Sequence, residues 1–253
     1  MRLFFVLLSI SNFLIATPPT TIPQEYYQEF TMDGTISVSS YYFDNSISAG
    51  QSTKYSYDEV EALKRKALLR REGYYGPTDR YLYAALDCYA SQIQGKRVGI
   101  IGSALPWYEA IVLVFGGFPI SIDYNKILSD HPEIKTLTIP EYDENPELFD
   151  AILSISSFEH DGLGRYGDPI NPQGDLDAMK KTVQMLKPNG LLFLAVPVGM
   201  DHIFWNAHRI YGKKRLPLLL KEWNTVATFG YEKKDLDQFS KGWHQPVFVL
   251  SPK

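Results

Sequence analysis

Cysteine is nearly absent from this chain of 253 residues, which contains only Cys88. A single thiol cannot form an internal disulfide, so the fold must be stabilised by its core. The chain is long enough for one large domain, and its 45% hydrophobic residues are typical of a globular protein. The helical pattern around Cys88 predicts that this thiol is buried.

The sequence also lacks an excess of basic residues and an apolar run of membrane-spanning length. There are 25 Lys and Arg against 29 Asp and Glu, so nucleic acid is not expected as a partner. The apolar run within residues 1–16 is shorter than the ~20 residues that span a bilayer, and no stable membrane span is expected. One Arg, this run and the small residues that follow it are typical of a signal peptide. We therefore expect a signal peptide or short anchor at residues 1–17, and a protein of the secretory lumen or one that is secreted.

Two catalytic fingerprints are missing as well. A dinucleotide-binding oxidoreductase needs the pattern G-x-G-x-x-G, and the turn at Gly102 does not have it. A serine hydrolase needs glycines on both sides of its nucleophile, and Ser103 lies in the sequence IGSAL. Both classes are disfavoured.

Strands alternate with helices from residue 96 onward. Apolar runs predict strands at 97–101, 119–122, 134–139, 151–155, 191–196, 225–229 and 246–250. Helical periodicity, a capping box at Ser56 and Glu59, and caps at Thr78 or Asp79 and at Asp175 predict helices at 56–72, 78–94, 106–115, 175–187 and 204–223.

The predicted fold class is α/β, with a Rossmann-like, mostly parallel seven-stranded sheet and helices on both faces. Antiparallel pairing is expected at the C-terminal edge of this sheet. The domain organisation is an N-terminal arm and helix at 18–75, to which no chemistry is assigned, and a main domain at 76–253.

Polar side chains follow the strand at 151–155, where Glu159, His160, Asp161 and Arg165 come in quick succession. In open α/β sheets, ligands bind in the crevice outside the carboxyl ends of the strands. The loop after this strand is therefore the expected place for a reaction centre.

Four segments resemble corresponding parts of the class I S-adenosylmethionine-dependent methyltransferase superfamily, across roughly residues 76–253. They are RVGIIGSALPW, SIDYN, FDAILSISSFEH and MLKPNGLLFLAVP. More narrowly, GSALPWYEAIVLVFGG and SSFEHDGLGRYGDPINPQGDLDAM resemble an uncharacterised methyltransferase-like family of nematodes and other organisms, similar to DUF268.

This resemblance implies that S-adenosylmethionine is the cofactor. Gly102 and Ser103 would line its methionyl group, Asp123 would bind its ribose hydroxyls, and Ser157 would lie beside the transferred methyl group. The residue types agree with these roles, because a glycine lets a ligand approach the backbone and a carboxylate accepts two hydroxyls.

The reaction that the resemblance implies is O-methylation of a glycan or another small molecule. His160 is the expected base, Glu159 would orient it, Asp161 is a second possible base, and Arg165 would hold the acceptor.

Three alternatives stay open. Glu159 and His160 resemble part of a metal motif, and with His202 or His208 they would hold a divalent ion. The loop could instead be a hydrogen-bonded turn, in which Asp161 and Asp168 cap backbone groups and Arg165 pairs with one of them. A secreted, non-catalytic binding protein with the same fold is the third alternative, because the turn has Gly102 alone where the superfamily has two or three glycines. Phe204, Trp205, Trp223 and Trp243 are expected in the core rather than in a sugar platform, although aromatic faces at the mouth of a site would suit a glycan or another apolar acceptor.

The first prediction concerns the N-terminus. The apolar run predicts that residues 1 to about 17 are removed during secretion. N-terminal sequencing of protein from the culture medium should begin near Pro18, whereas intact Met1 in a cytosolic fraction would contradict both the cleavage and the compartment.

Overall fold

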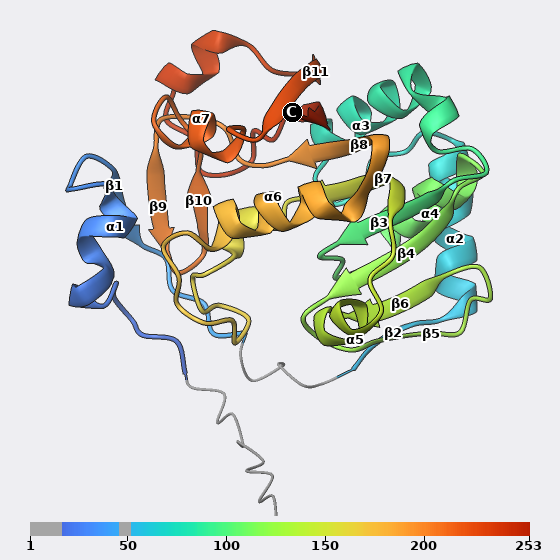
Figure 1. Cartoon of the computed structure of the whole chain (residues 1–253), viewed down its shortest axis with the longest axis horizontal. Helices are drawn as coiled ribbons and strands as arrows, with labels where there is room; N and C mark the ends of the chain where they lie inside the picture. The colour runs from blue at the N-terminus through green and yellow to red at the C-terminus, as the bar shows by residue number, and fades with distance from the viewer. Residues whose placement is uncertain (1–16, 46–51) are drawn as a thin grey trace, which may run out of the picture.

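A computed structural model describes residues 17–45 and 52–253 of the chain (Figure 1). The expected signal peptide lies outside these residues, apart from Thr17. A seven-stranded sheet forms the centre, in the order β11-β12-β8-β7-β3-β4-β6. Its strands are β3 (Arg97–Ile101), β4 (Phe118–Asp123), β6 (Lys135–Thr138), β7 (Phe149–Ile155), β8 (Leu186–Ala195), β11 (Trp223–Phe229) and β12 (Val247–Pro252).

The predicted fold class is confirmed. The strands from β8 to β6 pair in parallel, and β12 pairs antiparallel with both β8 and β11. The antiparallel pairing therefore lies at the C-terminal edge, as the sequence predicts.

Both faces of the sheet are buried. In β7, Ala151 and Leu153 pack into one apolar cluster, and Ile152 between them packs into the cluster on the other face. Successive side chains of a strand point to opposite faces, so the uninterrupted apolar run in β7 places it at the centre of a covered sheet.

Helices cover the two faces. The clusters and contacts place α2 (Tyr57–Leu68), α3 (Pro77–Cys88) and α4 (Trp107–Val114) on one side, and α5 (Ile139–Glu144), α6 (Gly174–Met185) and α7 (Arg215–Leu219) on the other. The Ser56 hydroxyl accepts the N–H of Glu59, which confirms that cap.

Three local expectations about the helices are wrong. Helix α3 begins at Pro77, so Thr78 and Asp79 lie inside it and do not cap it. Asp175 lies in the first turn of α6 but binds buried arginines instead of backbone N–H groups. Cys88 ends α3 outside its apolar stripe and is exposed.

The predicted helix over 204–223 is also wrong, except for the short α7. The chain there forms β9 (His202–Trp205) and β10 (His208–Ile210). Strand β9 pairs in parallel with β1 (Ser37–Ser40), more than 160 residues earlier in the sequence. A pairing over such a distance leaves no local periodicity in the sequence, which is why the strand could not be predicted.

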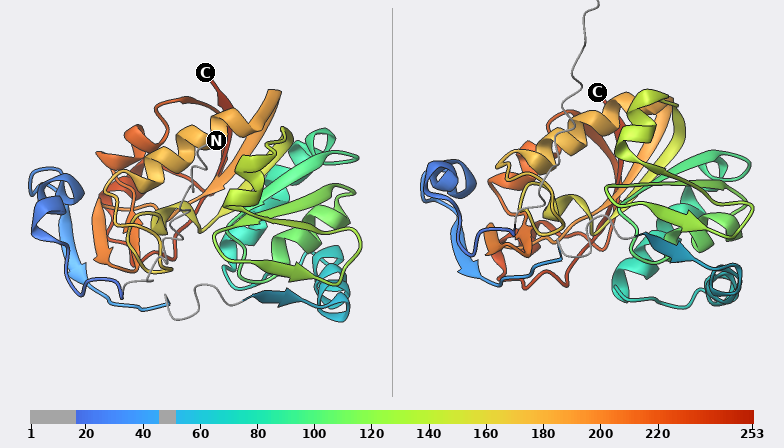
Figure 2. Two further views of the ribbon diagram at one scale, coloured as in Figure 1. Left: turned by 60° about the horizontal axis from the view of Figure 1, so that its bottom comes forward. Right: turned by 90° about the horizontal axis from the view of Figure 1, so that it is seen from below.

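The N-terminal arm forms short helices and strands within residues 17–45 and 52–75, the part of it that the structure describes. It contains η1 (Gln24–Tyr26), α1 (Tyr27–Thr31) and β1, and its Phe30 ring packs edge-on against Trp205 at 5.2 Å. Strand β2 (Thr53–Tyr55) pairs with β5 (Ile127–Ser129). Both views of Figure 2 keep α1 and β1 at one end of the molecule and β2 with α2 at the opposite end, so the two parts of the arm flank the main sheet.

Within the part of the chain that the structure describes, no helix has the length and apolar character needed to cross a membrane. Three buried charged residues, Asp175 of α6, Arg209 and Arg215, form a cluster. Asp175 accepts hydrogen bonds from Arg215 Nε at 2.9 Å and from Tyr211 Oη at 2.9 Å, and Arg209 Nε lies 3.8 Å away. Burial acts to raise the pKa of Asp175, but the two guanidinium groups outweigh it and hold the pKa below its usual value.

This cluster gives a prediction about stability. Asp175→Ala leaves Arg209 and Arg215 buried without their carboxylate, which should lower the free energy of unfolding by about 3–5 kcal/mol. Asp237→Ala is the matched control, because it removes a carboxylate from an exposed pair with Lys213 and should cost at most about 1 kcal/mol. Equal losses in urea denaturation would show that the cluster has no special role.

Candidate functional site

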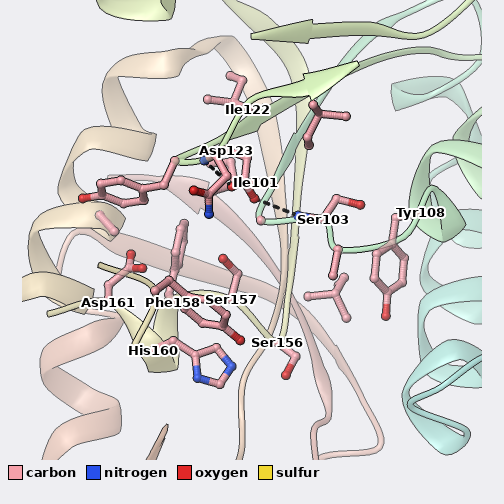
Figure 3. Close-up of a pocket in the computed structure, with 18 of the residues that line it drawn as sticks. Ile101, Ser103, Tyr108, Ile122, Asp123, Ser156, Ser157, Phe158, His160 and Asp161 are labelled. Carbon is pink, nitrogen blue, oxygen red and sulfur yellow. Dashed lines mark hydrogen bonds between the residues drawn. The ribbon is translucent and has the colours of Figure 1, made fainter. Parts of the chain in front are cut away.

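A cavity of about 1130 Å³ opens at the carboxyl ends of β3, β4 and β7. Figure 3 shows how side chains from the three strand ends face the same space. Gly102 and Ser103 follow β3, Asp123 ends β4, and Ser157 and His160 follow β7. Parallel strands bring these residues together although they are far apart in the sequence.

Gly102 makes a close contact with Ser157 in this cavity. Its φ of +71° favours glycine, and a Cβ at this position would lie 2.7 Å from the Cβ of Ser157. The turn after β3 and the turn after β7 therefore touch through a position where only glycine fits. The cofactor residues predicted from the sequence, Gly102 and Ser157, are in direct contact.

Asp123 lies beside this contact. Its two carboxylate oxygens accept the N–H groups of Ser103 at 3.3 Å and Asn125 at 2.8 Å. Burial raises the pKa of this carboxyl group, and the backbone donors oppose that rise. A carboxylate has about four acceptor positions, and the backbone of Ser103, Tyr124 and Asn125 takes up to three of them, so at least one remains for a ligand hydroxyl.

A second carboxyl group, Glu109, lies beneath the turn and was not predicted from the sequence. It is fully buried on α4, where it accepts hydrogen bonds from Ser121 Oγ at 2.6 Å and Ser103 Oγ at 3.0 Å. Tyr55 of β2 donates to the Ser103 carbonyl at 2.6 Å. Burial raises the pKa of Glu109 to about 7. An acidic residue inside the apolar run WYEAIVLV was the one signal that could have revealed it.

The loop after β7 carries a network centred on Ser156. Its hydroxyl donates to Glu159 Oε1 at 2.6 Å and accepts from Gln245 Nε2 at 3.0 Å. Burial raises the pKa of Glu159 to about 7, against the hydrogen bond from Ser156. Glu159 does not line the cavity, so its proton can reach a ligand only through its neighbours.

His160 lines the cavity with a defined tautomer. Its Nδ1 lies 2.5 Å from the carbonyl oxygen of Ala207, so Nδ1 carries the proton and Nε2 keeps its lone pair. Nε2 lies 3.7 Å from Glu159 Oε1. Burial, with Arg165 as the second cause, lowers the pKa of His160 to about 3. The imidazole is neutral at physiological pH.

Asp161 and Arg165 are placed differently. Asp161 lines the cavity, and burial raises its pKa well above the usual value. Arg165 lies outside the lining, where its Nε donates to Asn45 Oδ1 at 2.9 Å and its guanidinium covers the Phe43 ring at 4.5 Å. The structure therefore joins Arg165 to the N-terminal arm. Asp168 accepts the backbone N–H groups of the loop, as in the hydrogen-bonded alternative.

The ligands of the metal alternative are brought together only in part, since His160 Nε2 lies 3.7 Å from Glu159 Oε1 and the rings of His160 and His208 are 6.3 Å apart. His202 Nε2 lies 3.0 Å from Ser39 Oγ, and this histidine does not line the cavity. Among residues 17–45 and 52–253, no group of three His, Cys, Asp or Glu side chains has the arrangement of a metal site.

Residues 95–246 match the family described as "Caenorhabditis protein of unknown function, DUF268". The chain belongs to this family. The match runs from the residues before β3 to the residue before β12. It therefore includes the carboxyl ends of β3, β4 and β7, where the cavity opens. The narrower resemblance seen in the sequence is confirmed. A comparison with curated proteins found no match.

The fold of this chain resembles that of several solved structures. The 1,6-didemethyltoxoflavin-N1-methyltransferase of Burkholderia thailandensis, solved with S-adenosylhomocysteine, superimposes with a TM-score of 0.50 and 15% identity over 94% of this chain and 93% of that chain. The CcbJ methyltransferase of Streptomyces caelestis has a TM-score of 0.45 and 11% identity over 72% of this chain and 92% of that chain. The first of these likenesses and the strand order together identify a class I methyltransferase fold.

Glu109 gives a prediction about pH dependence. Its folded-state pKa of about 7 exceeds the ordinary glutamate value of 4.5, so the folded state holds the proton more tightly. The contribution of protonated Glu109 to the free energy of unfolding is therefore full below pH 4.5. It is lost as the pH rises to about 7, and the loss is about 3 kcal/mol at most. Glu109→Gln keeps a neutral group, so its stability relative to wild type should increase between pH 5 and pH 8.

Denaturation with urea at several pH values measures this difference. Ser121→Ala removes a hydrogen bond that lowers the pKa of Glu109, so it should move the change to higher pH. A difference between Glu109→Gln and wild type that stays constant with pH would contradict the buried-acid account.

Proposed function

We propose that this chain binds S-adenosylmethionine in the cavity and transfers its methyl group to an oxygen of a glycan or another small molecule. The observation that carries the proposal is the convergence of Gly102, Asp123 and Ser157 on one cavity. The methyltransferase fold supports it.

In this proposal the cofactor would bind along the carboxyl ends of β3, β4 and β7. The methionyl group would lie against the backbone of the turn at Gly102, whose missing side chain leaves room for Ser157. The ribose hydroxyls would bind Asp123 where the backbone donors leave its carboxylate free. Ser157 then flanks the sulfonium, which lies near the loop after β7.

The chemical step needs an aligned acceptor and a base. When bound, S-adenosylmethionine would supply the methyl group to the acceptor oxygen, and the electrons of its carbon–sulfur bond would remain on sulfur in S-adenosylhomocysteine. The acceptor oxygen becomes strongly acidic as it gains the methyl group, so even a weak base can take its proton. His160 Nε2 has a free lone pair and lines the cavity, which suits this role.

Glu159 supports His160 in this mechanism. Its carboxylate, 3.7 Å from Nε2, stabilises the imidazolium that forms when the proton arrives. Because the pKa of Glu159 is about 7, this support is complete only above that pH. Burial raises the pKa of Asp161 well above its usual value, which favours its protonated form, so this group could donate a hydrogen bond to the ligand or act as a second base.

The cofactor site predicts an effect on binding. Asp123→Ala should weaken S-adenosylhomocysteine binding by about 1.5–3 kcal/mol, which is the range for a hydrogen bond to a charged group. Asp130→Ala is the control, because Asp130 is exposed, pairs with Lys54 and does not line the cavity. Calorimetry with both variants measures the difference. Unchanged affinity in Asp123→Ala would remove this residue from the site, and no binding to wild type would refute the cofactor proposal.

The proposed role of His160 as the base predicts that its replacement lowers turnover. His160→Ala should lower methyl transfer by about 10²- to 10⁴-fold while cofactor affinity changes little. His202→Gln is the control, since His202 lies outside the cavity lining. The wild-type rate should rise as the pH passes about 7, and Glu159→Gln should flatten that rise.

Transfer of a radiolabelled methyl group to a mixed extract of glycans and metabolites measures these rates. Equal labelling by wild type and His160→Ala would exclude His160 as the base. Absence of labelling together with tight cofactor binding would favour the non-catalytic alternative.

A further inference from the structure

Trp243 stands apart from the other tryptophans. It is 63% exposed, while Trp107, Trp205 and Trp223 are 7%, 1% and 3% exposed. The expectation that Trp243 lies in the core is therefore wrong, since the loop before β12 carries it out to the rim of the cavity. Exposing the large apolar ring of Trp243 to water beside the cavity is unfavourable, which suggests that the ring has a binding role.

Trp243 is paired with a second exposed ring. Tyr74 is 72% exposed, and its ring centroid lies 5.8 Å from that of Trp243 at an interplanar angle of 49°. Tyr75 packs edge-on against Tyr74 at 4.9 Å, and both tyrosines line the cavity. The rings form a continuous aromatic rim.

The backbone that carries these rings is held in place from both sides. The Gly73 N–H donates to the buried carboxylate of Asp79 at 2.6 Å. Thr78 Oγ1 donates to the carbonyl of Gln245 at 2.9 Å, and the Gln245 amide donates to the carbonyl of Gly242 at 3.1 Å. The exposed rings therefore lie on ordered segments, so a ligand could bind them at little cost in conformational entropy.

Hydroxyl groups connect the rim with the proposed transfer position. Tyr75 and Ser156 both line the cavity, and Ser156 accepts from Gln245 Nε2 at 3.0 Å. Ser156 precedes Ser157, the residue in contact with Gly102. Beside the charged Lys66 and Glu72 of the lining, these side chains offer hydroxyl and amide groups, which suit an acceptor rich in hydroxyls.

We propose that Tyr74 and Trp243 form a sugar-binding platform that presents the hydroxyl of a neutral oligosaccharide to the methyl-transfer site. This assignment rests on the proposed function. Aromatic faces bind the apolar C–H side of sugar rings, and neighbouring tyrosine and serine hydroxyls bind the sugar's own hydroxyls. Two faces tilted by 49° leave no parallel-sided slot for a flat phenolic ring, but they can contact successive sugar residues of different orientation.

Tryptophan fluorescence tests the platform directly, because Trp243 is the exposed tryptophan and reports contact with a ligand. Wild type with S-adenosylhomocysteine is titrated with neutral tetrasaccharides of glucose and of N-acetylglucosamine, and with catechol as the phenolic probe. A blue shift that saturates with a tetrasaccharide is expected. In calorimetry, Tyr74→Ala and Trp243→Ala should each bind that sugar about tenfold more weakly.

Phe118→Ala is the matched control, because Phe118 is an exposed aromatic residue at the opposite end of β4 from Asp123. It should leave sugar affinity unchanged. S-adenosylhomocysteine affinity, measured separately, should be equal in all three variants.

Four outcomes would overturn the assignment. They are no shift with either tetrasaccharide while S-adenosylhomocysteine binds, a shift with catechol alone, equal sugar affinity in wild type and both platform variants, and an equal loss in Phe118→Ala. In the first of these the cofactor proposal stands. Failure of S-adenosylhomocysteine to bind would instead refute the proposed function, and the acceptor role would fall with it.

Discussion

The contact between Gly102 and Ser157 sets the geometry of the cavity. The turns after β3 and β7 meet there so closely that a Cβ on residue 102 would lie 2.7 Å from the Ser157 Cβ. The parallel pairing of the two strands brings these turns side by side, and the positive φ of Gly102 bends the first turn toward the second. Because Asp123 accepts the N–H of Ser103, the end of β4 is tied to the same contact. One glycine therefore connects three strand ends.

Buried acids support this arrangement. Glu109 holds the hydroxyls of Ser103 and Ser121 from below, and Glu159 holds that of Ser156 beside it. Burial raises the pKa of both carboxyl groups to about 7, and ionising a buried acid costs free energy. The hydrogen bonds that these groups accept offset part of that cost. Where related folds use further glycines in the first turn, this chain has a turn fixed by side-chain hydrogen bonds. Tyr55 extends that support to the N-terminal arm.

The sequence predicted the parts of the molecule that follow local rules. The apolar runs of β3 and β7 are continuous because both faces are covered, so their positions could be predicted closely, and the carboxyl-end location of Gly102, Asp123 and Ser157 followed from the parallel order. Strand β9 and the role of Arg215 could not be predicted, because their partners β1 and Asp175 lie far away in the sequence. The partners of Glu109 are close in the sequence, and its place inside an apolar run was the signal that was overlooked. The assignments of Gly102, Asp123 and His160 to cofactor and acceptor remain predictions.

The central claim is that the cavity at these three strand ends holds the cofactor. A crystal structure of the protein with S-adenosylhomocysteine tests it most directly. We predict the amino-acid end of the ligand against Gly102, its ribose hydroxyls within hydrogen-bonding distance of the Asp123 carboxylate, and its sulfur facing the loop that carries Ser157 and His160. A ligand bound elsewhere, or a cavity left empty at saturating ligand concentration, would contradict the account.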